Sequence, residues 1–154
     1  MPPRKVFALV TLTALTTAGL VLFAQPAPKP PMTSSAFDWN SIEVKTNATG
    51  SSRKFFEAPT PTLELLECHV TTLNPGDASH PPHKHPEEEV IIIKEGTLEA
   101  LINGEWKRVG PGSVLFMASN ILHGVRNVGD TPAVYHVLMW RSATTPKRET
   151  AEGE

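Results

Sequence analysis

Histidines and carboxylates crowd into one ten-residue stretch, His80-Pro-Pro-His-Lys-His-Pro-Glu-Glu-Glu89. In an extended chain alternate side chains share a face, so His83 and His85 point the same way. Glu89 follows them to that side as the next strand begins. Two imidazoles and a carboxylate suit a borderline divalent metal such as Mn, Fe, Co, Ni, Cu or Zn, whereas Ca and Mg prefer oxygen ligands.

A third imidazole, His123, lies far along the chain at the start of a short β-type run, and Val125 and Asn127 would share its face. Four protein ligands would leave an octahedral ion two open positions. The competing interpretation is a solvated histidine cluster in a proline-rich loop that binds nothing. His80 is expected to be a surface loop histidine, with a place beside or in the metal site as the alternative.

Short β-type runs separated by turn residues must position these side chains. Asn103-Gly104 is the signature of a two-residue hairpin, and Pro75-Gly76 and Gly110-Pro-Gly112 mark tight turns. Eight strands in about 105 residues predict an all-β sandwich or small barrel. The expected strands are 54–57, 62–73, 88–94, 97–102, 105–109, 113–117, 123–127 and 133–140.

The pattern His83-x-His85-x3-Glu89-x6-Gly96, followed by Gly112-x10-His123-x3-Asn127, resembles the two motifs of the cupin superfamily. The resemblance spans about half of the folded part and matches all four metal-ligand positions. It implies a double-stranded β-helix, a jelly-roll barrel, with a metal bound inside by His83, His85, Glu89 and His123. The chain departs from the family pattern at Ala118 and Asn120, where the family has Pro and Gly, so the turn there is expected to differ.

Several other residues were candidates for chemistry. By alternation Glu87 leans toward the site and is the candidate catalytic residue that exchanges a proton with a substrate, although a solvated carboxylate is the favoured interpretation at the start of a strand. His136 is expected in the core and Tyr135 on the opposite face of the same strand, as a further titrating candidate. Cys68 is expected to be packed as a small apolar residue, and His69 to lie at the surface.

The inward-facing positions predict an apolar pocket wall. Ile91 and Ile93 share the face of Glu89, Val125 shares that of His123, and Phe116 or Met117 joins them from the preceding run. No Arg or Lys is expected to point inward, which argues against a phosphorylated substrate. The expected ligand is a small neutral or singly charged organic molecule that reaches the metal through one or two oxygens.

Three classes of function fit these residues. The resemblance to cupin dioxygenases implies a metal-dependent oxidoreductase. A small-molecule or metal-binding module without turnover, and a metal-dependent isomerase or lyase, are the alternatives, because one fold hosts many chemistries. Nucleic acid is an unexpected partner, since the net charge is -2 and the chain has no basic stripe.

The first 24 residues predict a signal peptide: Arg4 and Lys5 precede an uncharged run over 6–24 that ends at Ala24. The protein is therefore expected to be exported, periplasmic or secreted, with residues 6–24 as an uncleaved membrane anchor in the alternative. A proline-rich linker over 25–36, a barrel domain over 37–141 and a disordered tail over 142–154 follow.

Two expectations concern metal and assembly. A chain that acquires its metal after export meets the affinity order Mn < Fe < Co < Ni < Cu > Zn without cytoplasmic buffering, so Cu, Zn or Ni is expected over Mn or Fe. A homodimer is expected, with the segment 37–44 as an edge for pairing.

Overall fold

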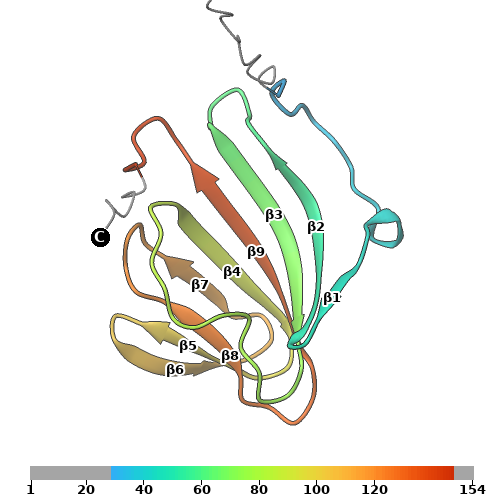
Figure 1. Ribbon diagram of the computed structural model, residues 1–154, viewed down its shortest axis with the longest axis vertical. Helices are drawn as coiled ribbons and strands as arrows, with labels where there is room; N and C mark the ends of the chain where they lie inside the picture. The colour runs from blue at the N-terminus through green and yellow to red at the C-terminus, as the bar shows by residue number, and fades with distance from the viewer. Residues whose placement is uncertain (1–28, 148–154) are drawn as a thin grey trace, which may run out of the picture.

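The computed structural model describes residues 29–147, which form two antiparallel β-sheets without an α-helix (Figure 1). A single 3-10 turn, Trp39–Ser41, precedes the strands. In chain order the strands of this part are β1 (Lys45–Asn47), β2 (Gly50–Ala58), β3 (Leu65–Leu73), β4 (Glu88–Glu95), β5 (Leu98–Ile102), β6 (Glu105–Val109), β7 (Val114–Met117), β8 (Gly124–Asn127) and β9 (Ala133–Arg141). The predicted all-β jelly roll is confirmed.

The larger sheet has the order β1-β2-β3-β9-β4-β7, and the smaller one β6-β5-β8. The last strand, β9, thus lies between β3 and β4 and joins the two halves of the larger sheet. In Figure 1 the smaller sheet lies across one end of the larger one, below β4 and β7. The long connection between β3 and β4, which carries the histidine motif, runs alongside β8, where Ala78 and His83 form antiparallel bridges with Arg126 and His123.

Two turns behave as their residues predict. Asn103 and Gly104 adopt φ values of 52° and 83° between β5 and β6, as a type I′ hairpin requires. Asn120 also has a positive φ, 58°. Asparagine tolerates this left-handed conformation better than most residues, so the turn before His123 forms although the family's glycine is missing there.

The core lies between the two sheets and is built from alternate residues of the strands. Ile91, Ile93, Val125 and Met117 are buried there, as expected, whereas Phe116 points outward and is 53% exposed. The remaining core residues are Leu73, Leu98, Ala100, Leu115, Ala133, Tyr135 and Val137.

The prediction of which side chains of β3 and β9 point into the core was wrong. Tyr135 and Val137 are buried in the core, whereas His136 lies on the outer face, and on β3 His69 faces inward with Cys68 on the outside. Both faces of these strands carry apolar residues, so hydrophobic alternation alone did not identify the inner one.

The outer face of β2 and β3 is partly covered by the segment before β1. The Phe37 ring centroid lies 5.1 Å from that of Phe56, which is paired with Cys68. Trp39 packs at 6.1 Å from Phe55. The segment 37–44 is therefore packed against the larger sheet as a turn rather than forming its edge, and β1 forms that edge instead.

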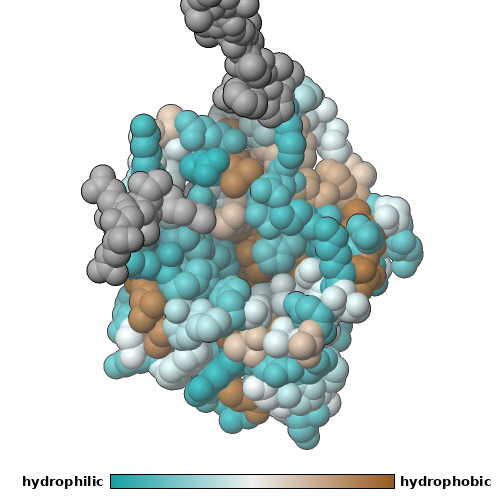
Figure 2. All heavy atoms as spheres, viewed as in Figure 1, coloured by the Kyte–Doolittle hydropathy of each residue, from teal (hydrophilic) through white to brown (hydrophobic). Residues whose placement is uncertain are grey.

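Polar residues cover most of the face seen in Figure 2, with apolar atoms in small patches between them. No helix among residues 29–147 has the length and apolar character that crossing a membrane would require. The predicted signal peptide or anchor over 1–24 lies outside the described residues, as do the start of the linker and the end of the tail.

Candidate functional site

Backbone pairing brings the distant histidines together. His83 and His123 form an isolated antiparallel bridge in which each amide donates to the other's carbonyl at 2.9 Å. The bridge pins the loop between β3 and β4 to the residue just before β8. A second contact, from the Asn120 amide to the His85 carbonyl at 2.8 Å, fixes the same two loops.

Three imidazoles, those of His83, His85 and His123, converge so that their ligand atoms all lie within 4.8 Å of one another. The carboxylate of Glu89 joins them: its Oε2 lies 3.2 Å from Nε2 of His85 and 3.9 Å from Nε2 of His123. Three of the four predicted ligands therefore converge, and the fourth, Glu89, lies beside two of them, His85 and His123.

The hydrogen bonds of the His85 and His123 rings are those expected of metal-binding histidines. Nδ1 of His85 lies 3.0 Å from the Glu87 carbonyl and Nδ1 of His123 lies 2.8 Å from the Ile121 carbonyl, which leaves both Nε2 atoms facing the cluster. His83 Nδ1 and His123 Nε2 are buried without a hydrogen-bond partner. Buried nitrogens are rarely left unpaired, and a bound cation would satisfy both.

The environments of the rings differ. Burial, supported by the neighbouring His80, lowers the pKa of His83 to about 4, so this ring is neutral at physiological pH. The hydrogen bond that Nε2 of His85 donates to the Glu89 carboxylate raises the pKa of His85 above its ordinary value. A neutral imidazole is the form that binds a metal ion.

His80 is exposed, as expected, yet it lines the same cavity. Its ring packs edge-on against His83, with 4.1 Å between the centroids, and its Nδ1 lies 3.2 Å from the Pro81 carbonyl. This arrangement places His80 at the mouth of the cavity, beside the three converging imidazoles rather than among them.

Glu87 is placed differently from the prediction. It is only 3% exposed, so it is not a solvated carboxylate, and it is absent from the residues that line the main cavity. Its Oε1 lies 3.2 Å from Nη1 of Arg141, and its backbone carbonyl contacts His85. Glu87 lies in the turn before β4, with its Oε2 3.6 Å from Nδ1 of His85, and its side chain thus contacts the ring from outside the cavity.

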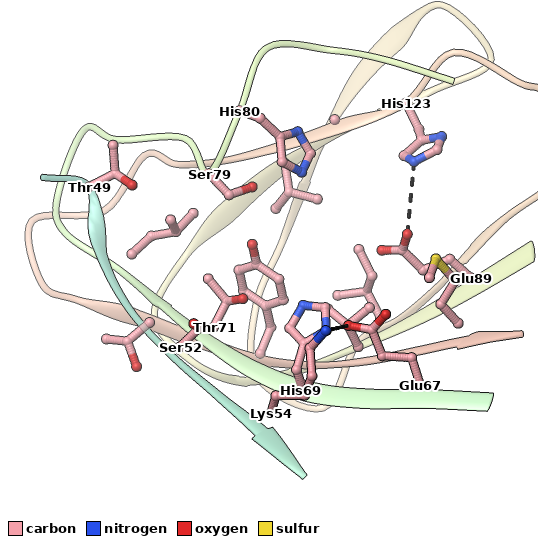
Figure 3. Close-up of a pocket in the computed structure, with 18 of the residues that line it drawn as sticks. Thr49, Ser52, Lys54, Glu67, His69, Thr71, Ser79, His80, Glu89 and His123 are labelled. Carbon is pink, nitrogen blue, oxygen red and sulfur yellow. Dashed lines mark hydrogen bonds and ion pairs between the residues drawn. The ribbon is translucent and has the colours of Figure 1, made fainter. Parts of the chain in front are cut away.

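The cluster opens into a cavity of about 400 Å³ on the inner face of β2, β3 and β9 (Figure 3). Ile91 and Val125 supply apolar wall, as expected, and Val137 of β9 joins them. The opposite wall is polar, which contradicts the predicted apolar lining; its side chains are Asn47, Thr49, Ser51, Ser52, Lys54, Glu67, His69, Thr71, Thr72 and Ser79. Lys54 is a cation at this wall that the sequence analysis did not anticipate.

Glu67, His69 and Lys54 form an ion-pair group on this wall. Oε1 of Glu67 lies 3.0 Å from Nδ1 of His69 and 3.4 Å from Nζ of Lys54, which also pairs with Glu57 at 2.6 Å. The hydrogen bond from His69 lowers the pKa of Glu67. The sequence signal for this group was the polar alternation Glu67-x-His69-x-Thr71, which competes with apolar residues at 66, 68 and 70.

The lowered pKa of Glu67 predicts a pH-dependent contribution to stability. Its folded pKa lies below the unfolded value, so the contribution is present above about pH 4.3 and is lost as pH falls through the folded pKa. We expect Glu67→Gln to lower the free energy of unfolding by about 1 kcal/mol at pH 7, and the difference to shrink in acid. Urea unfolding of both proteins from pH 7 to 3 measures it, with exposed Glu105→Gln as control. A constant difference across that range would contradict the assignment.

Tyr135 lies in the cavity wall and is 3% exposed. Its hydroxyl is hydrogen-bonded with the side chains of Ser79 and Thr71, and burial raises its pKa. The phenol therefore stays protonated at neutral pH and presents a hydrogen-bond donor within the cavity. The predicted outward orientation of Tyr135 is corrected.

Comparisons with known proteins agree with the fold. The profile of the Cupin_2 family, described as a cupin domain, matches residues 69–140. Over 94 residues, 59% of this chain, the sequence is 37% identical to dimethylsulfoniopropionate lyase DddQ of Ruegeria pomeroyi. The aligned region is 45% of that relative, so the chain spans less than half of its length.

Solved structures show the same fold at low identity. KdgF from Halomonas sp. superposes with a TM-score of 0.59 and 18% identity, over 72% of this chain and 97% of that one. A predicted oxalate decarboxylase from Thermotoga maritima gives 0.57 and 19%, over 70% and 99%. The polyketide cyclase RemF from Streptomyces resistomycificus gives 0.58 and 17%, over 75% and 89%.

Proposed function

We propose that this chain, whose residues 69–140 match the cupin domain family, is a metal-dependent lyase that eliminates a leaving group from a small carboxylate-bearing molecule. The observation that carries the proposal is the convergence of three imidazoles and Glu89, with two buried ring nitrogens unpaired, at one end of a polar cavity. The relationship to a lyase over most of the matched barrel supports the reaction class.

His83, His85 and His123 would hold a divalent transition metal, with the carboxylate of Glu89 as the fourth ligand. Cu, Zn, Ni, Mn and Fe all accept imidazole and carboxylate ligands. When bound, such an ion supplies a Lewis acid that binds the substrate's carboxylate and makes the neighbouring C–H more acidic.

The cavity wall supplies the remaining functions. The Tyr135 hydroxyl, oriented by Ser79 and Thr71, donates a hydrogen bond to a substrate oxygen. Ile91, Val125 and Val137 exclude water from the side of the cavity next to the ligands. A volume of about 400 Å³ suits a substrate of few carbon atoms together with its solvent.

Elimination from dimethylsulfoniopropionate illustrates the reaction. A base removes one proton from the carbon next to the carboxylate, the C–H electron pair forms the new C=C bond, and the C–S bond breaks with its electrons remaining on sulfur. The products are acrylate and dimethyl sulfide, and the proton stays on the base. No oxidant is consumed, which distinguishes this reaction from the oxidoreductase that the family resemblance implied.

We expect metal-loaded protein to release acrylate and dimethyl sulfide from dimethylsulfoniopropionate, and Tyr135→Phe to lower kcat by about 100-fold. Liquid chromatography measures acrylate and headspace gas chromatography measures dimethyl sulfide. His136→Phe, on the outer face of the same strand, is the matched control and should leave kcat unchanged.

The same assay separates the other classes of function. Oxygen consumption with an enolic or catecholic compound, without acrylate formation, would replace the lyase by an oxidoreductase. Saturable binding of small carboxylates without any product would establish a binding module. Either result would overturn the proposal.

A further inference from the structure

We propose that His69, oriented by Glu67, is a second catalytic group of this cavity and accepts the proton that the substrate loses. The inference rests on the proposed lyase function for the identity of the reaction. It concerns a residue that the sequence analysis assigned to the surface and that lies outside the metal cluster. The substrate class it implies carries a metal-binding carboxylate and an acidic C–H within reach of the opposite wall.

The strand register places His69 across the cavity from the metal cluster. On the inner face of the larger sheet, Glu67 of β3 is paired with Met139 of β9, and Met139 is paired with Glu89 of β4. Two strand spacings, roughly 10 Å, therefore separate the backbones that carry Glu67 and Glu89. His69 is the next inward residue of β3 after Glu67, and Figure 3 shows its ring standing in the cavity opposite Glu89.

The hydrogen bond to Glu67 defines which ring nitrogen can accept a proton. Oε1 of the carboxylate lies 3.0 Å from Nδ1 of His69, so Nδ1 carries the hydrogen and donates it. In the neutral ring Nε2 then has the free lone pair. The His69 side chain is 27% exposed, to a cavity that also receives the three converging imidazoles. A carboxylate that holds an imidazole in this way also stabilises the cation formed when Nε2 takes up a proton.

The surrounding charges favour the ionised form of Glu67, which is the form that accepts the hydrogen bond from His69. Lys54 of β2, paired with His69 in the sheet, lies 3.4 Å from Glu67 and favours its ionised form. Lys54 is itself paired with Glu57, which offsets its charge. On the other side, β9 contributes the apolar Val137 and Met139, and within β3 the next inward residue is Thr71. Glu67 is thus the anion in direct contact with His69.

The other cavity groups are less suited to this role. The phenol of Tyr135 is protonated at rest because burial raises its pKa, so it donates rather than accepts. His80 is exposed at the cavity mouth, and its Nδ1 contacts a backbone carbonyl instead of a carboxylate. His83, His85 and His123 face the metal position.

Kinetics of His69→Asn, Glu67→Gln and the control His136→Asn, each with metal content measured, test the proposal. With dimethylsulfoniopropionate we expect His69→Asn to lower kcat by about 100-fold, with KM changed less than about threefold and metal content unchanged. The acidic limb of the pH profile of kcat/KM should disappear in this variant. Glu67→Gln should lower kcat by about 10-fold, and His136→Asn should not change it. An acidic limb and kcat retained in folded His69→Asn would overturn the proposal.

A measurement that needs no turnover separates this inference from the lyase proposal. ¹⁵N NMR of the imidazoles should show His69 of the wild type as the Nδ1–H tautomer, and Glu67→Gln should weaken that preference. If the wild type makes no acrylate, the lyase proposal fails. The tautomer of His69 still shows whether Nδ1 donates to Glu67 and leaves Nε2 free to accept a proton. An Nε2–H tautomer of His69 would overturn the inference in either case.

Discussion

Replacing His85 by alanine is expected to lower the affinity for a divalent metal by at least about 100-fold, which removes the ion from purified protein. The His85 ring is held between the Glu87 carbonyl and the Glu89 carboxylate, so its loss takes away one ligand and the partner that orients another. Glu89→Ala should have the same effect, because it removes the carboxylate that lies 3.2 Å from Nε2 of His85 and 3.9 Å from Nε2 of His123. Elemental analysis and competition with a chromophoric chelator measure stoichiometry and affinity.

His80→Ala is the matched control for these variants. It removes an imidazole that contacts His83 only through ring packing, so most of the metal should remain bound. His136→Ala, on the outer face of β9, should bind as the wild type does. Full retention of metal in His85→Ala, or complete loss in His80→Ala, would contradict the assignment of the four ligands.

The second large effect is expected on stability, at Asn127. This side chain is 1% exposed and makes three hydrogen bonds: Nδ2 donates to the carbonyls of Leu73 and Thr131, and Oδ1 accepts from the Gly129 amide. It thereby links the end of β3, the end of β8 and the turn before β9. Asn127→Ala leaves these buried backbone groups without partners, and we expect a loss of roughly 3 kcal/mol.

Urea unfolding monitored by circular dichroism measures this loss, with an unchanged m-value showing that the folded state is preserved. Asn74→Ala is the control, because Asn74 is exposed and donates one long hydrogen bond to the Ala48 carbonyl. It should change stability by less than about 0.5 kcal/mol. An equal effect of the two substitutions would show that burial of the Asn127 network is not what stabilises the turn.

The sequence predicted the three imidazoles that converge because the spacing of these residues follows strand geometry. His83, His85 and Glu89 fall on alternate positions of an extended chain, and the second motif marks His123 independently. Most strand bounds were predicted to within a few residues for the same reason: turn residues such as Asn103-Gly104 stand between them. The three-residue β1 escaped prediction because it is too short for a hydrophobic pattern.

The polar wall could not be predicted in the same way. Glu67 and His69 alternate with the apolar Leu66, Cys68 and Val70 in β3, and hydropathy assigns this apolar set to the core. In the structure the apolar outer positions are covered by the segment around Phe37, so both faces are partly buried. The predicted direction of the Glu87 side chain differs from the structure for a related reason. Alternation gives side-chain directions only along a strand, whereas Glu87 lies in the turn before β4.

The backbone bridge between His83 and His123 has a consequence for metal exchange. Main-chain hydrogen bonds hold two ligands at their final separation without help from an ion. The entropy of closing the 39-residue loop between them is therefore lost when the barrel folds, not when metal arrives. Binding energy is then available for affinity itself, and one ion can replace another by simple dissociation and rebinding while the barrel stays folded.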